Sequence, residues 1–299
     1  MEMTKFRFSL KRQLVSIIAC FILVFSGCFN NEAHIENNSN DTTTSFCYDE
    51  LPAYDYEPFI TVNGNKPFHP WNGDKSTIVL KELDSLGRCQ DVEAIVGKDT
   101  LPNEERGSIG DIRPSGWHMI RYDDLIESRY LYNRCHLIAF EISGINKDPR
   151  NLITGTRYLN IEGMFPFENQ VASYIKSTGN HVYYHATPVF IDDELVCRGV
   201  LLEGKSIEDD QLEFCVFCYN VYPGILIDYS DGNSEAQSIS RSLLPSVKQN
   251  YVVNTNTRRF HYPDCKSVDD MKMKNRMDVF ESRETLISQG YTPCGSCNP

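Results

Sequence analysis

Apolar residues recur along this 299-residue chain in short runs that favour strands over helices. Residues 59–68 alternate in polarity around an Asn-Gly pair, which predicts a strand followed by a turn. Residues 89–97 and 130–140 predict two more strands. Four apolar runs between residues 181 and 229 follow one another with turn residues between them, as in an antiparallel meander. The pattern predicts an α+β fold built mainly on antiparallel sheet.

Two helices are expected among these strands. One lies within residues 74–90 and ends near Gly87. The other follows Asn160 and has Pro166 in its first turn, a position that suits proline. Apolar residues over 167–175 share one face of this second helix, and Gly179 ends it.

The N-terminus has the features of a targeting segment. Basic residues are followed by an apolar run and then by small residues before Cys28. Residues 25–28 resemble a bacterial lipobox, in which Cys28 would be the lipidation site and would attach the chain to a membrane. An ordinary cleaved signal and an uncleaved anchor are the alternatives, and each places the folded part outside the cytoplasm.

Composition then divides the rest of the chain. Residues 29–57 are polar and are expected to form a flexible tether. A main domain is expected over residues 58–232, a linker over 233–249 and a small module over 250–299. The net charge is −12, which argues against binding nucleic acid through bulk charge. A polyanion would have to meet a local basic site.

The C-terminal module carries a pattern of metal ligands. His261, Cys265, Cys294 and Cys297 have the number and spacing of a structural Zn²⁺ site. Two disulfides are the alternative, but three cysteines and one histidine cannot form two internal bridges. The module resembles the small zinc-binding fold of the Ada DNA-repair regulator, in which all four ligands are cysteines. With His261 in the first place, a structural or nucleic-acid-binding role is expected.

The candidate chemistry lies between residues 131 and 175. On a strand, Arg134 and His136 share a face, and a base beside a guanidinium suits phosphodiester hydrolysis. Cys135 points to the other face, so a Cys–His nucleophilic pair is excluded. Asn160 and Glu168 offer the oxygen ligands that Mg²⁺ prefers. These residues indicate a metal-assisted hydrolase of a phosphate ester.

Residues 133–136, read as Asn-Arg-Cys-His, together with residues 151–160 and Glu168, resemble the DNA/RNA non-specific endonucleases, a ββα-metal nuclease family. The resemblance covers residues 59–232. Two positions depart from the family motif, since Asn133 replaces an acid and Cys135 replaces a glycine.

The resemblance implies a role for each residue of the motif. His136 would be the general base, and Asn160 would bind Mg²⁺ or Mn²⁺, with Glu168 reaching the ion through water. Arg134 would stabilise phosphate charge, and Asn151 would orient the site. No small-molecule cofactor is implied.

Two arginines, Arg113 and Arg157, are expected to contact substrate, although solvated surface charges are the alternative for both. Contacts to phosphate carry no sequence information, so the implied substrate is DNA, and RNA as well, cut without specificity. The rival hypothesis is a surface-tethered nucleic-acid-binding protein with little or no catalysis, which the altered Asn133 and Cys135 would favour. His181 and His185, which flank a predicted strand, are interpreted as structural.

Overall fold

The computed structural model describes residues 45–69, 73–123, 125–126, 129–238, 248–263, 265–297 and 299. The segment over residues 1–28, with its candidate lipidation site Cys28, lies outside the described residues. None of the helices in the described part is long and apolar enough to span a membrane.

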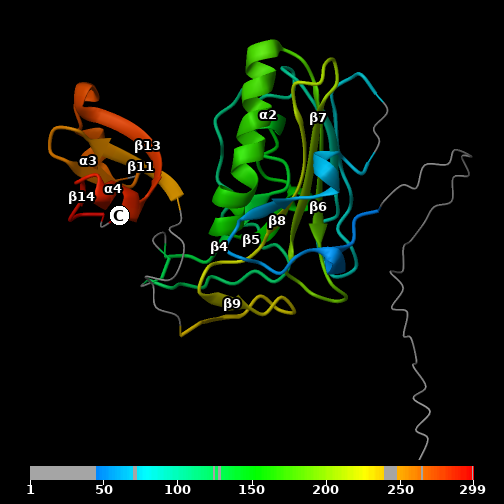
Figure 1. The fold of residues 1–299 in the computed structure, drawn as a ribbon, viewed down its shortest axis with the longest axis horizontal. Helices are drawn as coiled ribbons and strands as arrows, with labels where there is room; N and C mark the ends of the chain where they lie inside the picture. The colour runs from blue at the N-terminus through cyan, green and yellow to red at the C-terminus, as the bar shows by residue number, and fades with distance from the viewer. Residues whose placement is uncertain are drawn as a thin grey trace, which may run out of the picture. The chain divides into compact units, whose positions relative to one another are not determined.

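A six-stranded antiparallel sheet forms the centre of the main domain (Figure 1). Its spatial order is β1-β8-β7-β6-β3-β2, and each neighbouring pair runs antiparallel. Three of the four runs of the meander predicted over residues 181–229 are confirmed as the consecutive strands β6, β7 and β8. The strands span β1 Phe59–Thr61, β2 Thr77–Leu80, β3 Val92–Val96, β6 Val182–Val189, β7 Gly199–Ser206 and β8 Glu213–Tyr219.

The helix predicted within residues 74–90 is wrong, because this segment begins with strand β2 and continues as an irregular loop and turn. Alternate residues of β2 are exposed and half-buried, and Ile78 packs against the core. The strand pairs with β3 along its whole length. The turn that follows closes where the Gly87 amide donates to the Asp84 carbonyl at 2.9 Å, with Gly87 at φ 75°. Burial that alternates with every residue is typical of a strand and not of a helix.

The helix predicted after Asn160 is confirmed as α2, Phe165–Thr178. Pro166 lies in its first turn, and Gly179 ends it in the left-handed conformation with φ 81°. A π-helical turn, η4 (Leu159–Met164), precedes it. Val171 and Ile175 on α2 pack into the same core cluster as residues of β3, β6 and β7. The helix therefore covers one face of the large sheet.

A second, two-stranded sheet carries the motif residues. Strand β4 (Tyr132–His136) pairs antiparallel with β5 (Leu152–Thr156), which confirms the strand predicted within residues 130–140. The short helix α1 (Phe140–Ser143) and the turn η3 (Pro149–Asn151) lie between them. Both strands lie near the N-terminal end of α2 (Figure 1).

The opposite face of the large sheet is covered by the segment that precedes it. Phe46, Tyr48 and Leu51 pack against a cluster that contains Phe217 and Tyr219. The tether expected over residues 29–57 thus has its last part on the surface of the sheet. The two remaining short elements here are the 3₁₀ turns η1 (Tyr48–Glu50) and η2 (Asn63–Asn65).

Strand β9 (Ile225–Ile227), the last of the predicted series, pairs with β10 (Ser234–Ala236) and not with the large sheet.

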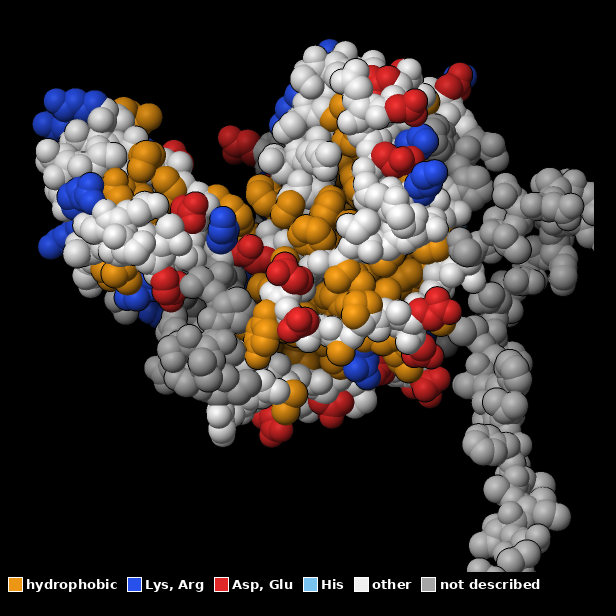
Figure 2. All heavy atoms as spheres, in the orientation of Figure 1, with side chains coloured by type: hydrophobic (Ala, Val, Ile, Leu, Met, Phe, Trp, Pro, Cys, Tyr) orange, Lys and Arg blue, Asp and Glu red, His pale blue; other side chains and the backbone are white. Residues whose placement is uncertain are grey.

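The described C-terminal residues form a four-stranded sheet of order β13-β11-β12-β14. Figure 2 shows acidic side chains across the visible face of the main domain and basic side chains on the C-terminal module. The module's elements are β11 Lys248–Asn254, β12 Arg259–His261, α3 Lys266–Asp269, η6 Met273–Asn275, β13 Arg276–Ser282, α4 Arg283–Ser288 and β14 Thr292–Pro293.

Candidate active site

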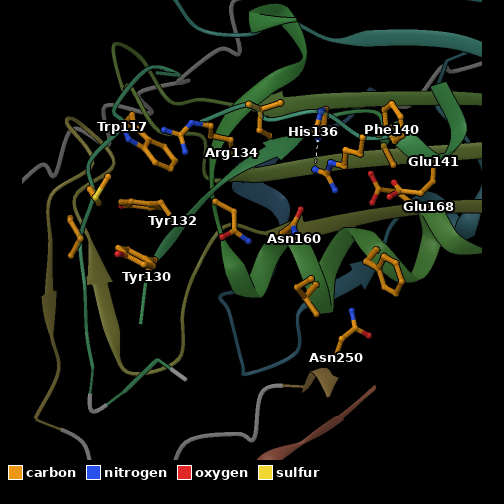
Figure 3. Close-up of a pocket in the computed structure, with 18 of the residues that line it drawn as sticks. Trp117, Tyr130, Tyr132, Arg134, His136, Phe140, Glu141, Asn160, Glu168 and Asn250 are labelled. Carbon is orange, nitrogen blue, oxygen red and sulfur yellow. Dashed lines mark hydrogen bonds between the residues drawn. The ribbon is translucent and has the colours of Figure 1, made fainter. Parts of the chain in front are cut away.

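A cavity of about 580 Å³ lies beside β4 and the start of α2, and its wall includes most of the motif. His136, Asn160 and Glu168 line it together, with Arg134 in the same wall. Figure 3 shows His136 and Asn160 between an aromatic end, where Trp117 lies, and an acidic end, where Glu168 lies. Side chains from a strand, a π-helical turn and a helix therefore converge on one space.

The hydrogen bonds of His136 fix which ring nitrogen is basic. Nε2 lies 2.9 Å from the carbonyl oxygen of Asn146, which can only accept, so Nε2 carries the proton. Nδ1 lies 3.4 Å from Nη2 of Arg106, which can only donate, so Nδ1 presents its lone pair. Burial lowers the pKa of His136, the Asn146 carbonyl opposes this, and the charge of Arg106 lowers the pKa further. The ring is therefore held neutral, with a defined basic atom.

Asn151 holds the chain that follows His136. It is completely buried on η3, and its Oδ1 accepts from the Ile138 amide at 3.0 Å. Its Nδ2 donates to the Ile138 carbonyl, also at 3.0 Å. Both polar groups of one backbone residue are thereby satisfied by one side chain, which fixes the path of the chain two residues beyond the base.

Asn160 and Glu168 supply the oxygen atoms of the site. Asn160 Oδ1 accepts a hydrogen bond from the Cys135 thiol at 3.0 Å. Glu168 is buried, and burial raises the pKa of its carboxyl to about 8, with the charge of Glu141 adding to the effect and Arg106 opposing it. A buried carboxyl beside a second carboxyl either keeps its proton or ionises with a compensating cation. An oxygen-only set of this kind fits Mg²⁺ or Mn²⁺.

Arg134 shares the cavity with His136, as strand alternation predicts, but its guanidinium has partners within the protein. Nε donates to the Ile112 carbonyl at 2.6 Å and Nη2 donates to the Gly110 carbonyl at 2.7 Å. The guanidinium carbon lies 4.1 Å from the ring centre of Trp117, a cation–π contact. Arg134 therefore anchors the loop before β4.

The two arginines expected at the substrate are placed differently. Arg113 donates to the carbonyls of Gly110 and Ile112, in the same loop. Among the residues that the structure describes, neither Arg113 nor Arg157 is part of the cavity wall.

Sequence reasoning missed three residues of the site. Arg106 lies beside Nδ1 of His136, and the Asn146 carbonyl accepts a hydrogen bond from Nε2 of His136. Glu141 lies close to Glu168. Arg106 precedes His136 by 30 positions in a segment without regular structure. No periodic pattern connects the two, so only the folded chain brings them together.

The domain that carries this cavity is similar to known nucleases. Residues 72–208 match the model of a family described as DNA/RNA non-specific endonuclease. NucA from Streptococcus agalactiae with magnesium ion bound has a similar structure, with 22% identity and a TM-score of 0.56 over 64% of this chain and 93% of that chain. The Sda1 nuclease with bound zinc ion is 30% identical over 54% of this chain and 81% of that chain, with a TM-score of 0.46.

Residues 72–208 belong to the DNA/RNA non-specific endonuclease family. The α+β fold with antiparallel sheets and the resemblance read from residues 133–168 are thereby confirmed. Its enzymatic class is that of a phosphodiesterase-type endonuclease.

A second group of metal ligands lies in the C-terminal module of this endonuclease. One ligand atom from each of His261, Cys265, Cys294 and Cys297 lies within 4.8 Å of the others. Burial raises the pKa of Cys294, but hydrogen bonds from Cys297 and Ser296 bring it down to about 7. Nδ1 of His261 is buried and has no hydrogen-bond partner among the described residues. An unsatisfied imidazole nitrogen beside three sulfurs suits Zn²⁺.

Proposed function

We propose that this protein is an extracytoplasmic, metal-dependent endonuclease that hydrolyses phosphodiester bonds of DNA, with RNA as a second substrate, irrespective of sequence. The observation that carries the proposal is the fixed tautomer of His136. Its basic Nδ1 is directed into a cavity that also contains Asn160 and Glu168. A buried neutral base beside an oxygen-rich cation site is what hydrolysis of a phosphodiester requires.

In the proposed reaction, Nδ1 of His136 takes a proton from a water molecule, and the resulting hydroxide attacks phosphorus. The bond from phosphorus to the 3′ oxygen breaks, so the phosphate stays on the 5′ oxygen and the 3′ oxygen takes a proton from solvent. The Asn146 carbonyl accepts from Nε2–H and stabilises the imidazolium that forms. Asn151 keeps His136 in place through the backbone of Ile138.

Asn160 is proposed to hold the divalent ion directly, and Glu168 to hold it through water. The ion, Mg²⁺ or Mn²⁺, would neutralise charge on the phosphate and on the leaving oxygen. Glu141, beside Glu168, adds a further carboxylate to the acidic end of the cavity. The closeness of these two acids supports a cation at this end.

Arg106 is proposed to stabilise the charge of the phosphate as it is attacked. Its guanidinium lies beside the basic nitrogen, so a phosphate that receives the activated water also meets Arg106. Arg134 is proposed to act mainly by holding the loop from Gly110 to Trp117. Substrate contacts by Arg113 and Arg157 remain part of the proposal, outside the cavity wall.

The remaining parts of the chain are proposed to deliver and support this domain. Residues 1–28 would direct export, with Cys28 as the lipidation site and membrane anchor. The nuclease domain would span residues 58–232. The module over 250–299 would be a folding unit that depends on Zn²⁺ bound to its His and three Cys, because so small a unit has a limited core of its own.

Cleavage of supercoiled plasmid in Mg²⁺ and in chelator tests the proposal. Nicked and linear products are expected in Mg²⁺ and none in chelator. His136→Ala should abolish cleavage and keep the circular dichroism of the wild type. His181→Ala is the matched control, because His181 bonds to the exposed Glu208 and lies outside the cavity wall. Cleavage by His136→Ala at the wild-type rate would refute the proposal, and binding without cleavage by the wild type would favour the non-catalytic alternative.

A further inference from the structure

A cluster of histidines and carboxylates lies on the face of the large sheet turned away from α2. His185 on β6 and Glu203 on β7 are direct cross-strand partners. Their neighbours Tyr184, Ala186 and Leu202 belong to the core under α2, so alternation turns His185 and Glu203 to the other face. One ligand atom from each of His69, His185 and Glu203 lies within 4.8 Å of the others. The nuclease mechanism uses none of these residues.

Glu203 is held so that one oxygen is available to a ligand. Its side chain is completely buried, and Oε1 accepts from the backbone amides of Phe68 and His69. Oε2 faces two imidazole nitrogens, Nδ1 of His69 at 2.6 Å and Nδ1 of His185 at 2.9 Å. Two histidines thus converge on a single oxygen of an anchored carboxylate.

The other ring nitrogen of His185, Nε2, also has a hydrogen-bond partner. Nε2 lies 3.0 Å from Oδ2 of Asp91, and Asp91 is fixed through its other oxygen by Lys81 at 2.7 Å. If Nε2–H donates to Asp91, the lone pair of Nδ1 meets the lone pairs of Glu203 Oε2. The 2.9 Å separation therefore requires either a proton on both nitrogens of His185 or a cation between Nδ1 and Oε2. The carboxylate–histidine arrangement is also the one that orients metal-binding imidazoles.

We propose that His69, His185 and Glu203 bind a Zn²⁺ ion, with Asp91 orienting His185. Two imidazole nitrogens and one carboxylate oxygen are a common ligand set for zinc. Bonds of about 2.1 Å in a tetrahedral site separate the ligand atoms by roughly 3.4 Å. The observed separations are shorter, so the ligands must move apart by less than about 1 Å. His69, whose side chain is 50% exposed, has room to do so.

The position of His69 indicates what the ion does. His69 belongs to the segment that begins with β1 and crosses the sheet, whereas His185 and Glu203 belong to the sheet itself. A cavity of about 290 Å³, with Tyr183 and Thr187 in its wall, provides space for water as a fourth ligand. Zinc here ties the crossing segment to β6 and β7, which is a stabilising role independent of the nuclease centre.

Zinc content tests the proposal in the full-length chain. The protein is stripped with chelator and equilibrated at buffered free Zn²⁺, and bound zinc is measured by mass spectrometry. His69→Ala should bind one zinc ion fewer per chain than the wild type, both in the natural sequence and with Cys294→Ser in the C-terminal site. Asp91→Asn should weaken this site about 10- to 100-fold.

His181→Ala is the control, because His181 also lies 2.6 Å from a carboxylate, that of Glu208, and is absent from the three-ligand group. It should retain the zinc content of the wild type. Since His69 is half exposed, its replacement should leave circular dichroism and plasmid cleavage unchanged. Equal zinc content and affinity in His69→Ala and the wild type would overturn the proposal and show that a proton on His185 supplies the charge.

Discussion

Arg106 provides the sharpest test of the nuclease centre, because sequence patterns gave no reason to choose it. Replacing Arg106 with Gln removes a cation 3.4 Å from the basic nitrogen of His136 and keeps a polar side chain of similar reach. If the guanidinium stabilises the attacked phosphate, its loss removes a charged donor that acts in the transition state. Such donors contribute about 2.7–4 kcal/mol, so kcat should fall about 10²- to 10³-fold.

The same substitution has a second, independent effect on the base. The charge of Arg106 is one of the causes that lower the pKa of His136, after burial. Without it, His136 should bind its proton more readily. The rising limb of the rate–pH profile should therefore move to higher pH in Arg106→Gln, whereas Arg106→Lys, which keeps the charge, should leave the limb near its wild-type position.

Single-turnover cleavage of a labelled duplex, at saturating Mg²⁺ and constant ionic strength, measures both effects. The KM for duplex should change less than kcat, because the interaction strengthens as the phosphate is attacked. A kcat within threefold of the wild type, or a rising limb that does not move, would refute the assignment. A loss confined to KM would reduce Arg106 to a residue that only binds the substrate.

Three further predictions follow from the described contacts. For the wild type, kcat/KM should rise with pH through a pKa below 6.5 and then remain level, because burial and Arg106 lower the pKa of His136 and the neutral form is the base; a midpoint well above 6.5 would contradict this. Asn151→Leu leaves the buried amide and carbonyl of Ile138 without partners, so urea unfolding should show a loss of about 1–3 kcal/mol for each group, together with lower activity. Cys294→Ser should remove one Zn²⁺ per chain in elemental analysis and loosen the C-terminal module towards protease, while plasmid cleavage persists.

Helix α2 and the large sheet could be predicted because their signals are local. Pro166 and Gly179 mark the two ends of α2, and the strands of the meander alternate or are apolar throughout. The helix predicted within residues 74–90 is wrong because Leu83 and Leu86 continue the apolar spacing of a helix. Both are exposed, at 37% and 39%, and lie beyond the end of β2. Their spacing therefore reports no buried face.

At the site, strand alternation predicted which side chains share a face. It did not predict the hydrogen-bond partners of those side chains. The exclusion of a Cys135–His136 pair followed from alternation, and His136 bonds instead to Asn146 and Arg106. Cys135 is buried and donates to Asn160. That contact joins β4 to the π-helical turn, and a spacing of 25 residues contains no periodic signal for it. Tertiary contacts of this kind depend on how separate elements pack.

The two arginines near His136 show how the loop and the base depend on each other. Arg134 holds the carbonyls of Gly110 and Ile112 and stacks on Trp117, so it fixes the loop that begins just after Arg106. Arg113 donates to the same two carbonyls, so a second guanidinium lies in this loop. Burial lowers the pKa of Arg134, and the charge of Arg113 lowers it further. Arg106 and Arg134 thus place two positive charges on the wall of one cavity in a chain of net charge −12. Charge concentrated in a cleft raises the local concentration of a polyanion even when the rest of the surface repels it. We therefore propose that Arg134 supports catalysis by fixing the loop that lies between Arg106 and β4.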